Sequence, residues 1–174
     1  MAPMGLITLI LLLLYLLLFG VDTITGEPVT THSGNVTVQS AAWRVVAGDG
    51  YLGVVVPEAD APVFVREAGW NPAAAYWTPS PEEIAALEAE IDDTWTANAP
   101  RHARDEDLSG HLRQYVGTVE AGEHLILVNA FCDPYDADWQ SEPVVVADGG
   151  ACYFQATWDV ERAEFRSLTV NGEA

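Results

Sequence analysis

The sequence predicts a single α+β domain in which one amphipathic helix packs on a curved antiparallel β-sheet, preceded by a hydrophobic helix at the N-terminus. Three observations support this fold class. A charge-free apolar run opens the chain, one capped helical pattern lies near its middle, and short β-prone runs separated by turns fill most of the rest. We therefore divide the chain into a signal peptide or membrane anchor at residues 1–21, a linker at 22–40 and the α+β domain at 41–174.

The N-terminal segment indicates where the protein goes. Residues 1–21 carry no charged side chain, and residues 6–19 are mostly Leu and Ile. A signal-peptide core needs about 7–15 apolar residues, whereas a membrane-spanning helix needs roughly 20. The run fits the first length alone and the second with its flanks, so a cleaved signal and a retained anchor both stay open. Either one predicts contact with a membrane and a domain outside the cytoplasm, anchored with the N-terminus inside or released as a secreted or periplasmic protein.

The chain is strongly acidic, with a formal net charge of −19 at pH 7, and all seven of its basic side chains are Arg. Such a surface repels nucleic acid and anionic lipid headgroups, so both are poor partners for it, and we expect no binding of nucleic acid. Cations and basic proteins are compatible with it. High negative charge also keeps a protein hydrated and monomeric, so adaptation to salt is an alternative explanation.

The first strands of the domain flank a tight turn. Residues 43–46 and 51–56 are β-prone runs on either side of Asp49 and Gly50. Because an Asp-Gly pair supplies the positive φ that a hairpin turn requires, we predict that these runs pair as antiparallel strands. Residues 63–66 predict a third strand.

The helical pattern begins at residues 80–83, which combine an N-cap serine, a proline at the first helical position and a glutamate at the third. One apolar stripe follows, formed by Ile84, Leu87, Ile91 and Trp95. Pro100 cannot continue a helix. The sequence therefore predicts a helix from residue 81 to about residue 98 that packs on the sheet through this stripe.

Four later runs, at residues 112–120, 124–131, 151–159 and 165–170, predict an antiparallel meander. Alternation places the apolar side chains of the middle two strands on one face: Ile126, Val128, Ala130, Cys132, Cys152, Phe154, Ala156 and Trp158. An even number of cysteines in an exported chain favours one disulfide, here between Cys132 and Cys152. Two buried free thiols are the alternative.

An acidic loop between two of these strands contains the candidate metal ligands Asp133, Asp136, Asp138 and Glu142. Carboxylates gathered in a loop are typical ligands of Ca2+, which is our candidate cofactor. The glycine and the ligand spacing of an EF-hand are missing, so a solvated acidic loop is the alternative. Trp139, in the same loop, is the candidate ligand-binding aromatic.

Three histidines, His102, His111 and His124, are residues of the type that serve as general bases or metal ligands. Their spacing matches neither a His-x-His nor a His-Glu-x-x-His pattern, and the chain has no Gly-x-Ser-x-Gly sequence. We therefore expect surface histidines and assign no catalytic residue.

Four segments form a recognisable combination: residues 76–80 (YWTPS), 113–117 (RQYVG), 128–132 (VNAFC) and 148–154 (DGGACYF). The combination resembles small exported bacterial proteins of unassigned function. This resemblance covers about residues 75–174, implies a bacterial envelope or secreted protein and adds weight to the disulfide. The order of helix then strands is also similar to that of cystatin-like and NTF2-like rolls, which implies an architecture but no activity.

Together these features favour a non-enzymatic extracytoplasmic domain that binds a protein or a small ligand. One alternative is a cation-dependent binder or hydrolase that uses the Asp133–Glu142 loop. Another is a structural envelope protein without a ligand.

Overall fold

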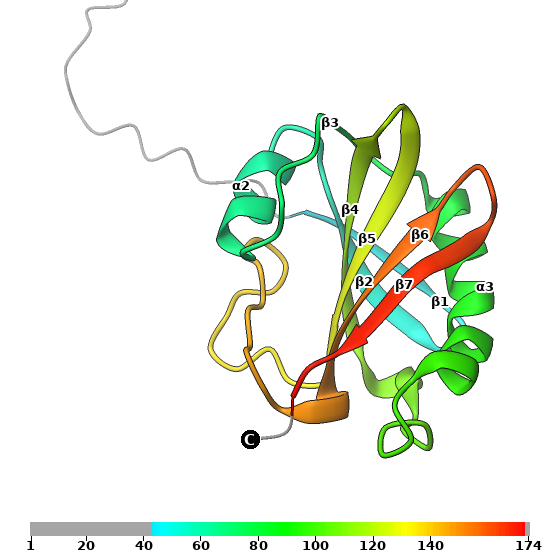
Figure 1. Ribbon diagram of the computed structural model, residues 1–174. Coiled ribbons are helices and arrows are strands. Elements are labelled where there is room, and N and C mark those ends of the chain that lie inside the picture. The colour runs from blue at the N-terminus through cyan, green and yellow to red at the C-terminus, as the bar shows by residue number, and fades with distance from the viewer. Residues whose placement is uncertain (1–42, 173–174) are drawn as a thin grey trace, which may run out of the picture. The chain divides into compact units, whose positions relative to one another are not determined.

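The computed structural model describes residues 43–172, which form a seven-stranded sheet with two α-helices (Figure 1). The elements are β1 (Arg44–Gly48), β2 (Tyr51–Val56), α2 (Ala61–Glu67), β3 (Ala75–Trp77), α3 (Pro81–Asn98), η1 (Leu108–Gly110), β4 (Leu112–Glu120), β5 (Glu123–Phe131), η2 (Gly150–Cys152), β6 (Tyr153–Asp159) and β7 (Glu164–Val170). This is the α+β class that the sequence predicts. The hydrophobic helix predicted at residues 1–21 and the linker at 22–40 lie outside the described residues. Within residues 43–172, no helix is both long and apolar enough to cross a membrane.

The strands lie in the order β1-β2-β4-β5-β6-β7, and β3 pairs with β4 beyond the end of β2. The predicted first hairpin and the β4–β7 meander are confirmed. The prediction of an antiparallel sheet is wrong at one pair, because β2 and β4 are parallel. The cause is the path of the chain: α2, β3 and α3 separate β2 from β4, and such a long crossover can return the chain in its original direction.

Residues 63–66, which we predicted as a strand, belong to helix α2. Pro62 lies in the first turn of α2, where its missing N–H costs no hydrogen bond. Phe64 and Val65 are buried against the sheet beside Val54. A short apolar run suits a buried helix as well as a strand, so its periodicity alone could not separate the two.

Helix α3 has the start and the end that the sequence predicts. The Ser80 hydroxyl accepts a hydrogen bond from the Glu83 amide at 3.3 Å, and the Glu83 carboxylate accepts one from the Ser80 amide at 2.7 Å. These bonds satisfy two backbone donors that the first turn of a helix leaves free. The predicted stripe, Ile84, Leu87, Ile91 and Trp95, is buried.

The two faces of the sheet have different coverings (Figure 1). On the face that we call the α3 face, helix α3 packs on a core that includes Tyr115, Ile126, Val128, Ala130, Phe154, Ala156 and Trp158. On the opposite side, the groove face, α2 packs on Val54, Val56 and Val116, and the loop at residues 132–149 packs on Phe131 and Tyr153. The alternation predicted for β5 and β6 is thus confirmed within both strands.

The predicted disulfide between Cys132 and Cys152 is present, with the two Cα atoms 5.0 Å apart. The cysteines do not lie on the α3 face, where alternation placed them. Strand β5 ends at Phe131 and β6 begins at Tyr153, so each cysteine lies one residue outside its strand. The bridge therefore closes the base of the loop at residues 132–149.

Candidate ligand-binding groove

The four predicted metal ligands lie in this loop, but the structure does not gather them around a common point. The Asp133 carboxylate accepts a hydrogen bond from the Tyr135 amide at 2.8 Å, and the Asp138 carboxylate accepts one from the Ser141 hydroxyl at 2.7 Å. Both carboxylates therefore stabilise turns within the loop. Across residues 43–172, no three His, Cys, Asp or Glu side chains are arranged to hold a metal ion. Binding of Ca2+ by Asp133, Asp136, Asp138 and Glu142 remains a prediction without a coordination geometry.

Trp139 is half-buried and anchors the loop. Its ring meets the Phe131 ring edge-on, with centroids 6.3 Å apart. The most exposed aromatic of the loop is instead Tyr135, which is 66% exposed and stacks on Tyr153 at a centroid distance of 6.1 Å. Ligand binding by Trp139 stays a prediction, and its observed contacts are those of a packing residue.

Two amide side chains on the groove face hold the loop against the sheet. The Gln114 side-chain nitrogen donates to the carbonyls of Trp139 and Glu142, at 2.8 Å and 2.6 Å. Its oxygen accepts from the Val144 amide and from the Asn129 side chain. Gln114 is fully buried, so these bonds replace the water that it loses. Sequence reasoning missed this pair, although Asn129 interrupts an apolar run in β5 and lies opposite Gln114 of β4.

The histidines lie far apart and in different surroundings. His111 is only 2% exposed, which contradicts the expectation of a surface residue. Its Nε2 lies 3.2 Å from the Ala151 carbonyl oxygen, and its Nδ1 has no hydrogen-bond partner among the described residues. Burial lowers the pKa of His111, chiefly because desolvation disfavours the charged ring. His102 is exposed in a turn.

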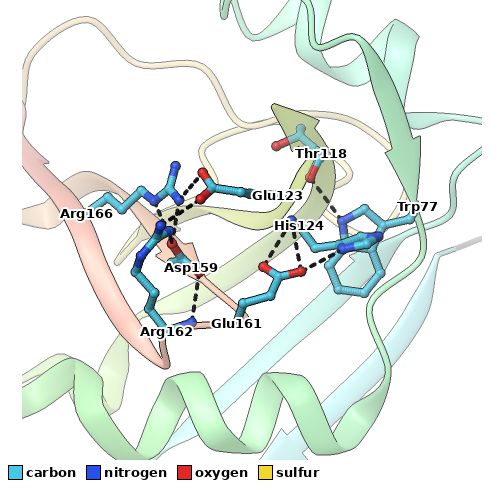
Figure 2. A network of polar contacts seen from close by, with 8 residues as sticks. All are labelled: Trp77, Thr118, Glu123, His124, Asp159, Glu161, Arg162 and Arg166. Carbon is cyan, nitrogen blue, oxygen red and sulfur yellow. Dashed lines mark hydrogen bonds and ion pairs between the residues drawn. The ribbon is translucent and has the colours of Figure 1, made fainter. Parts of the chain in front are cut away.

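His124 lies in a polar network at one end of the sheet (Figure 2). Its Nδ1 is 2.9 Å from the Glu161 carboxylate, and its ring meets the Trp77 ring edge-on at a centroid distance of 5.3 Å. The pKa of Glu161 is lowered, first by the hydrogen bond from His124. Because the Val160 amide also donates to the His124 carbonyl, this contact joins the β4–β5 turn to the β6–β7 turn.

Beside this pair, the Asp159 carboxylate is buried between two arginines (Figure 2). Arg162 and Arg166 both donate to Asp159, and both also pair with Glu123. Desolvation alone would raise the pKa of Asp159, but the hydrogen bonds from Arg162 and Arg166 lower it on balance. The network fixes the β6–β7 turn, so we assign it a structural role.

A second ion pair lies beneath α3. The Glu88 carboxylate is 3.3 Å from Arg113 Nε and accepts a hydrogen bond from the Tyr115 hydroxyl at 2.8 Å. Arg113 also donates to the carbonyls of His111 and Leu108. Desolvation raises the pKa of Glu88, although Arg113 and Tyr115 oppose this shift. These contacts tie α3 to β4.

The groove face contains a depression that neither α2 nor the loop fills. Its first hollow has a volume of about 380 Å³ and is lined by residues that include Trp70, Asn71, Gln155, Thr157 and Thr169. The hollow therefore lies over β6 and β7, next to the segment that follows α2.

A second hollow of about 240 Å³ continues the first. Its lining includes Trp70 and Gln155 again, together with Asn129, Val145 and Asn171. Because both hollows have Trp70 and Gln155 in their linings, they adjoin at these two residues, and we refer to the two hollows together as the groove.

Trp70 is held in place by its own neighbours. Helix α2 ends in a turn at Gly69, whose φ of 72° lies in the left-handed region that glycine adopts without strain. The Trp70 amide then donates to the Val65 carbonyl at 2.9 Å, and the indole packs edge-on against the Phe64 ring at 5.6 Å. The indole is half-buried, so its other side is available to the groove.

The groove contains hydrogen-bonding groups without partners. Asn129 is only 5% exposed, and its nitrogen donates to Gln114 and to the Val144 carbonyl. Its oxygen accepts no hydrogen bond from any described residue. The Gln155 nitrogen donates to Asn171 at 3.3 Å, and its oxygen likewise accepts none within residues 43–172. Gln155 is partly exposed, and the buried polar atoms without a partner among the described residues belong to His111, Arg113 and Thr118. The two amide oxygens are therefore open to solvent, and a ligand that donates hydrogen bonds to them would replace water.

The groove is almost free of charge. Among the described residues that line its two hollows, Glu120 is the only ionisable one. Sequence reasoning did not find this site, although Gln155 and Thr157 give β6 a polar face in the interior of the sheet. Polar side chains on such a strand are the local signal that could have indicated an uncovered face.

No protein-family model matches this chain, and no curated protein or solved structure is significantly similar to it.

Proposed function

We propose that this chain is a non-enzymatic binding protein that acts outside the cytoplasm and holds an uncharged polar ligand in the groove. The observation that carries the proposal is the contrast between the groove and the rest of the chain. The net charge is −19, yet Glu120 is the single ionisable side chain among the described residues of the groove lining. A site of neutral donors and acceptors around an aromatic ring is suited to an uncharged ligand.

The groove also meets the usual requirements of a preformed site. Its lining comes from the segment that follows α2, from β4, β5, β6 and β7, from Asn171 and from the loop at residues 132–149. The disulfide and the Gln114 amide hold that loop in place. Preorganised side chains lose little conformational entropy when a ligand binds. The geometry thus supports binding and supplies no nucleophile and base in contact within the described part of the groove.

Calorimetric titration of the full chain tests the proposal with three kinds of probe. Neutral hexasaccharides and a hexaalanine peptide with blocked termini are uncharged, and hexaarginine is the charged probe. We expect at least one neutral probe to bind, and Gln155→Ala or Thr157→Val to weaken it about fivefold, the effect of one lost hydrogen bond. Thr96→Val on the exposed side of α3 is the matched control and should leave the affinity unchanged. Binding of hexaarginine alone, unaffected by the groove variants, would contradict the proposal.

The location outside the cytoplasm rests on two features. Residues 1–21 are apolar and uncharged, and Cys132 and Cys152 form a disulfide, which is rare in a reducing cytosol. A reporter that is active only in oxidising compartments can be fused to the C-terminus, after Ala174. We expect this reporter to be active. N-terminal sequencing of the same protein distinguishes a cleaved signal from a retained anchor. A silent export reporter with an active cytosolic one would overturn the location.

A further inference from the structure

The groove has the form expected for a chain-like ligand. Its two hollows, of about 380 Å³ and 240 Å³, lie on either side of the Trp70–Gln155 pair. The first is within the range of about 300–1,000 Å³ that holds a whole small molecule, and the second is slightly below it. A ligand that fills both hollows must therefore pass the Trp70–Gln155 pair and place successive units on each side.

The groups along the groove favour a particular chemistry. Trp70 combines a half-buried apolar ring with an indole N–H, which suits a ligand unit with an apolar face and polar edges. Around it, the amide oxygens of Asn129 and Gln155 are available as acceptors, and the hydroxyls of Thr157 and Thr169 can both donate and accept. A sugar ring matches this set, because its C–H faces are apolar and its hydroxyls both donate and accept.

A peptide matches the groove less well. Peptides bound along a sheet usually add a strand to an exposed edge and pair with its backbone. The groove lies instead on the face of β6 and β7, and the β6 backbone is already paired on both sides with β5 and β7. A ligand on this face meets side chains rather than the free edge of β7. Recognition here must come from side chains, which are uncharged except for Glu120.

From these observations we infer that the ligand is an unbranched, uncharged oligosaccharide that lies across Trp70. This inference rests on the proposed binding function and narrows it to one ligand class. The acidic chain and the Glu120 carboxylate at one end of the groove disfavour sugars that carry carboxylate or phosphate groups.

The test is a titration of the full chain with maltohexaose, cellohexaose and chitohexaose, with hexagalacturonate as the anionic counterpart. We expect saturable binding of at least one neutral hexasaccharide and weaker binding of hexagalacturonate. Trp70→Ala should reduce the affinity about tenfold or more, as for a central aromatic contact. Because Trp70→Ala also removes packing on Phe64, Gln155→Ala serves as a second variant with an expected loss of about fivefold.

The outcomes separate the inference from the function on which it rests. Binding of blocked hexaalanine but of no hexasaccharide, with loss of that binding in Gln155→Ala, would overturn the inference and leave the proposed function intact. Hexasaccharide binding that is unchanged in both Trp70→Ala and Gln155→Ala would overturn the site, and preferential binding of hexagalacturonate would overturn the uncharged class. If no neutral probe binds, the proposed function and the inference both fail.

Discussion

The two faces of the sheet are built from the same strands but are closed in different ways. The α3 face is covered by an 18-residue helix whose apolar stripe fills the space above β4, β5 and β6. The groove face is covered by a seven-residue helix and an irregular loop, and the groove remains over β6 and β7. A long helix brings a continuous apolar surface, whereas a loop covers only the positions that its anchoring side chains reach. The difference shows that the covering element, rather than the strand pattern, decides where a groove remains on the sheet.

The two faces also differ in the interactions that hold their covering elements, helix α3 and the loop at residues 132–149, against the sheet. A buried ion pair between Glu88 and Arg113 ties α3 to β4. On the groove face, the disulfide and the side chains of Gln114 and Asn129 hold the loop. Removing each of these in turn tests whether the two faces are independent.

The largest effect is expected on the α3 face. Arg113→Met leaves the Glu88 carboxylate buried without its cation, which should lower the free energy of unfolding by about 3–5 kcal/mol. The double variant Arg113→Met with Glu88→Leu removes both charges and should recover most of that loss. Urea denaturation measures both variants. Equal destabilisation of the single and double variants would show that the ion pair does not carry the effect.

The next effect comes from the bridge on the groove face. Replacing both Cys132 and Cys152 by Ala should lower the free energy of unfolding by about 3 kcal/mol, since the bridge closes a segment of 20 residues. The loss should add to that of Arg113→Met if the two faces are independent. Thermal unfolding with and without a reductant provides the control, because the reductant should destabilise the wild type and leave the variant without the two cysteines unchanged. A strongly non-additive triple variant would break the comparison.

A smaller effect is expected from the amide network, with a neighbouring residue as its control. Gln114→Leu removes the side-chain partner of the Trp139 and Glu142 carbonyls and of the buried Val144 amide, and should cost about 1–3 kcal/mol. Thr118 is equally buried on the same strand, but its hydroxyl has no hydrogen-bond partner among the described residues. Thr118→Val should therefore change the stability by no more than about 0.5 kcal/mol. Chemical denaturation that ranks the two variants the other way would contradict the role of Gln114.

The smallest effect concerns pH on the α3 face. Because burial lowers the pKa of His111, the unfolded chain takes up a proton at this histidine before the folded protein does as the pH falls below about 6.5. This difference lowers the stability as the pH falls, and His111→Gln should remove it.

The raised pKa of Glu88 acts in the opposite direction, because the folded protein then binds more protons than the unfolded chain above pH 4.5.

Comparison of the wild type and His111→Gln at pH 7.5 and 5.5 isolates the histidine, since Glu88 is common to both. The wild type should lose more stability between these two pH values than the variant does. Equal losses would show that His111 takes up its proton equally readily in the folded and unfolded states.

Local patterns predicted the parts of the fold that depend on neighbours in the chain. Helix α3 follows from Ser80, Pro81 and Glu83, and the β4–β7 meander follows from alternation and turn residues. Helix α2 was missed because its run of three apolar residues, Val63, Phe64 and Val65, is too short to show a period. The parallel pairing of β2 with β4 was missed because it depends on the path of the long segment between them.

The candidate site shows the same contrast between what local sequence indicates and what depends on distant segments. The composition of the acidic loop led us to predict a metal site there, but the carboxylates of Asp133 and Asp138 stabilise turns within the loop. The groove lies where Trp70, Asn129, Gln155 and Thr169 meet, and these residues come from four separate segments of the chain. No spacing rule connects them.

By itself, the sequence determined the apolar N-terminal segment, the acidic charge, the bounds of α3, the inward sides of β5 and β6, and the two cysteines available for a bridge. Each of these depends on composition or on interactions between residues a few positions apart. Only the tertiary structure decided which strands are neighbours, what covers each face and where the groove remains. The physical reason is that packing and hydrogen bonds between distant segments, such as those of Gln114 with the loop, leave no periodic trace in the sequence.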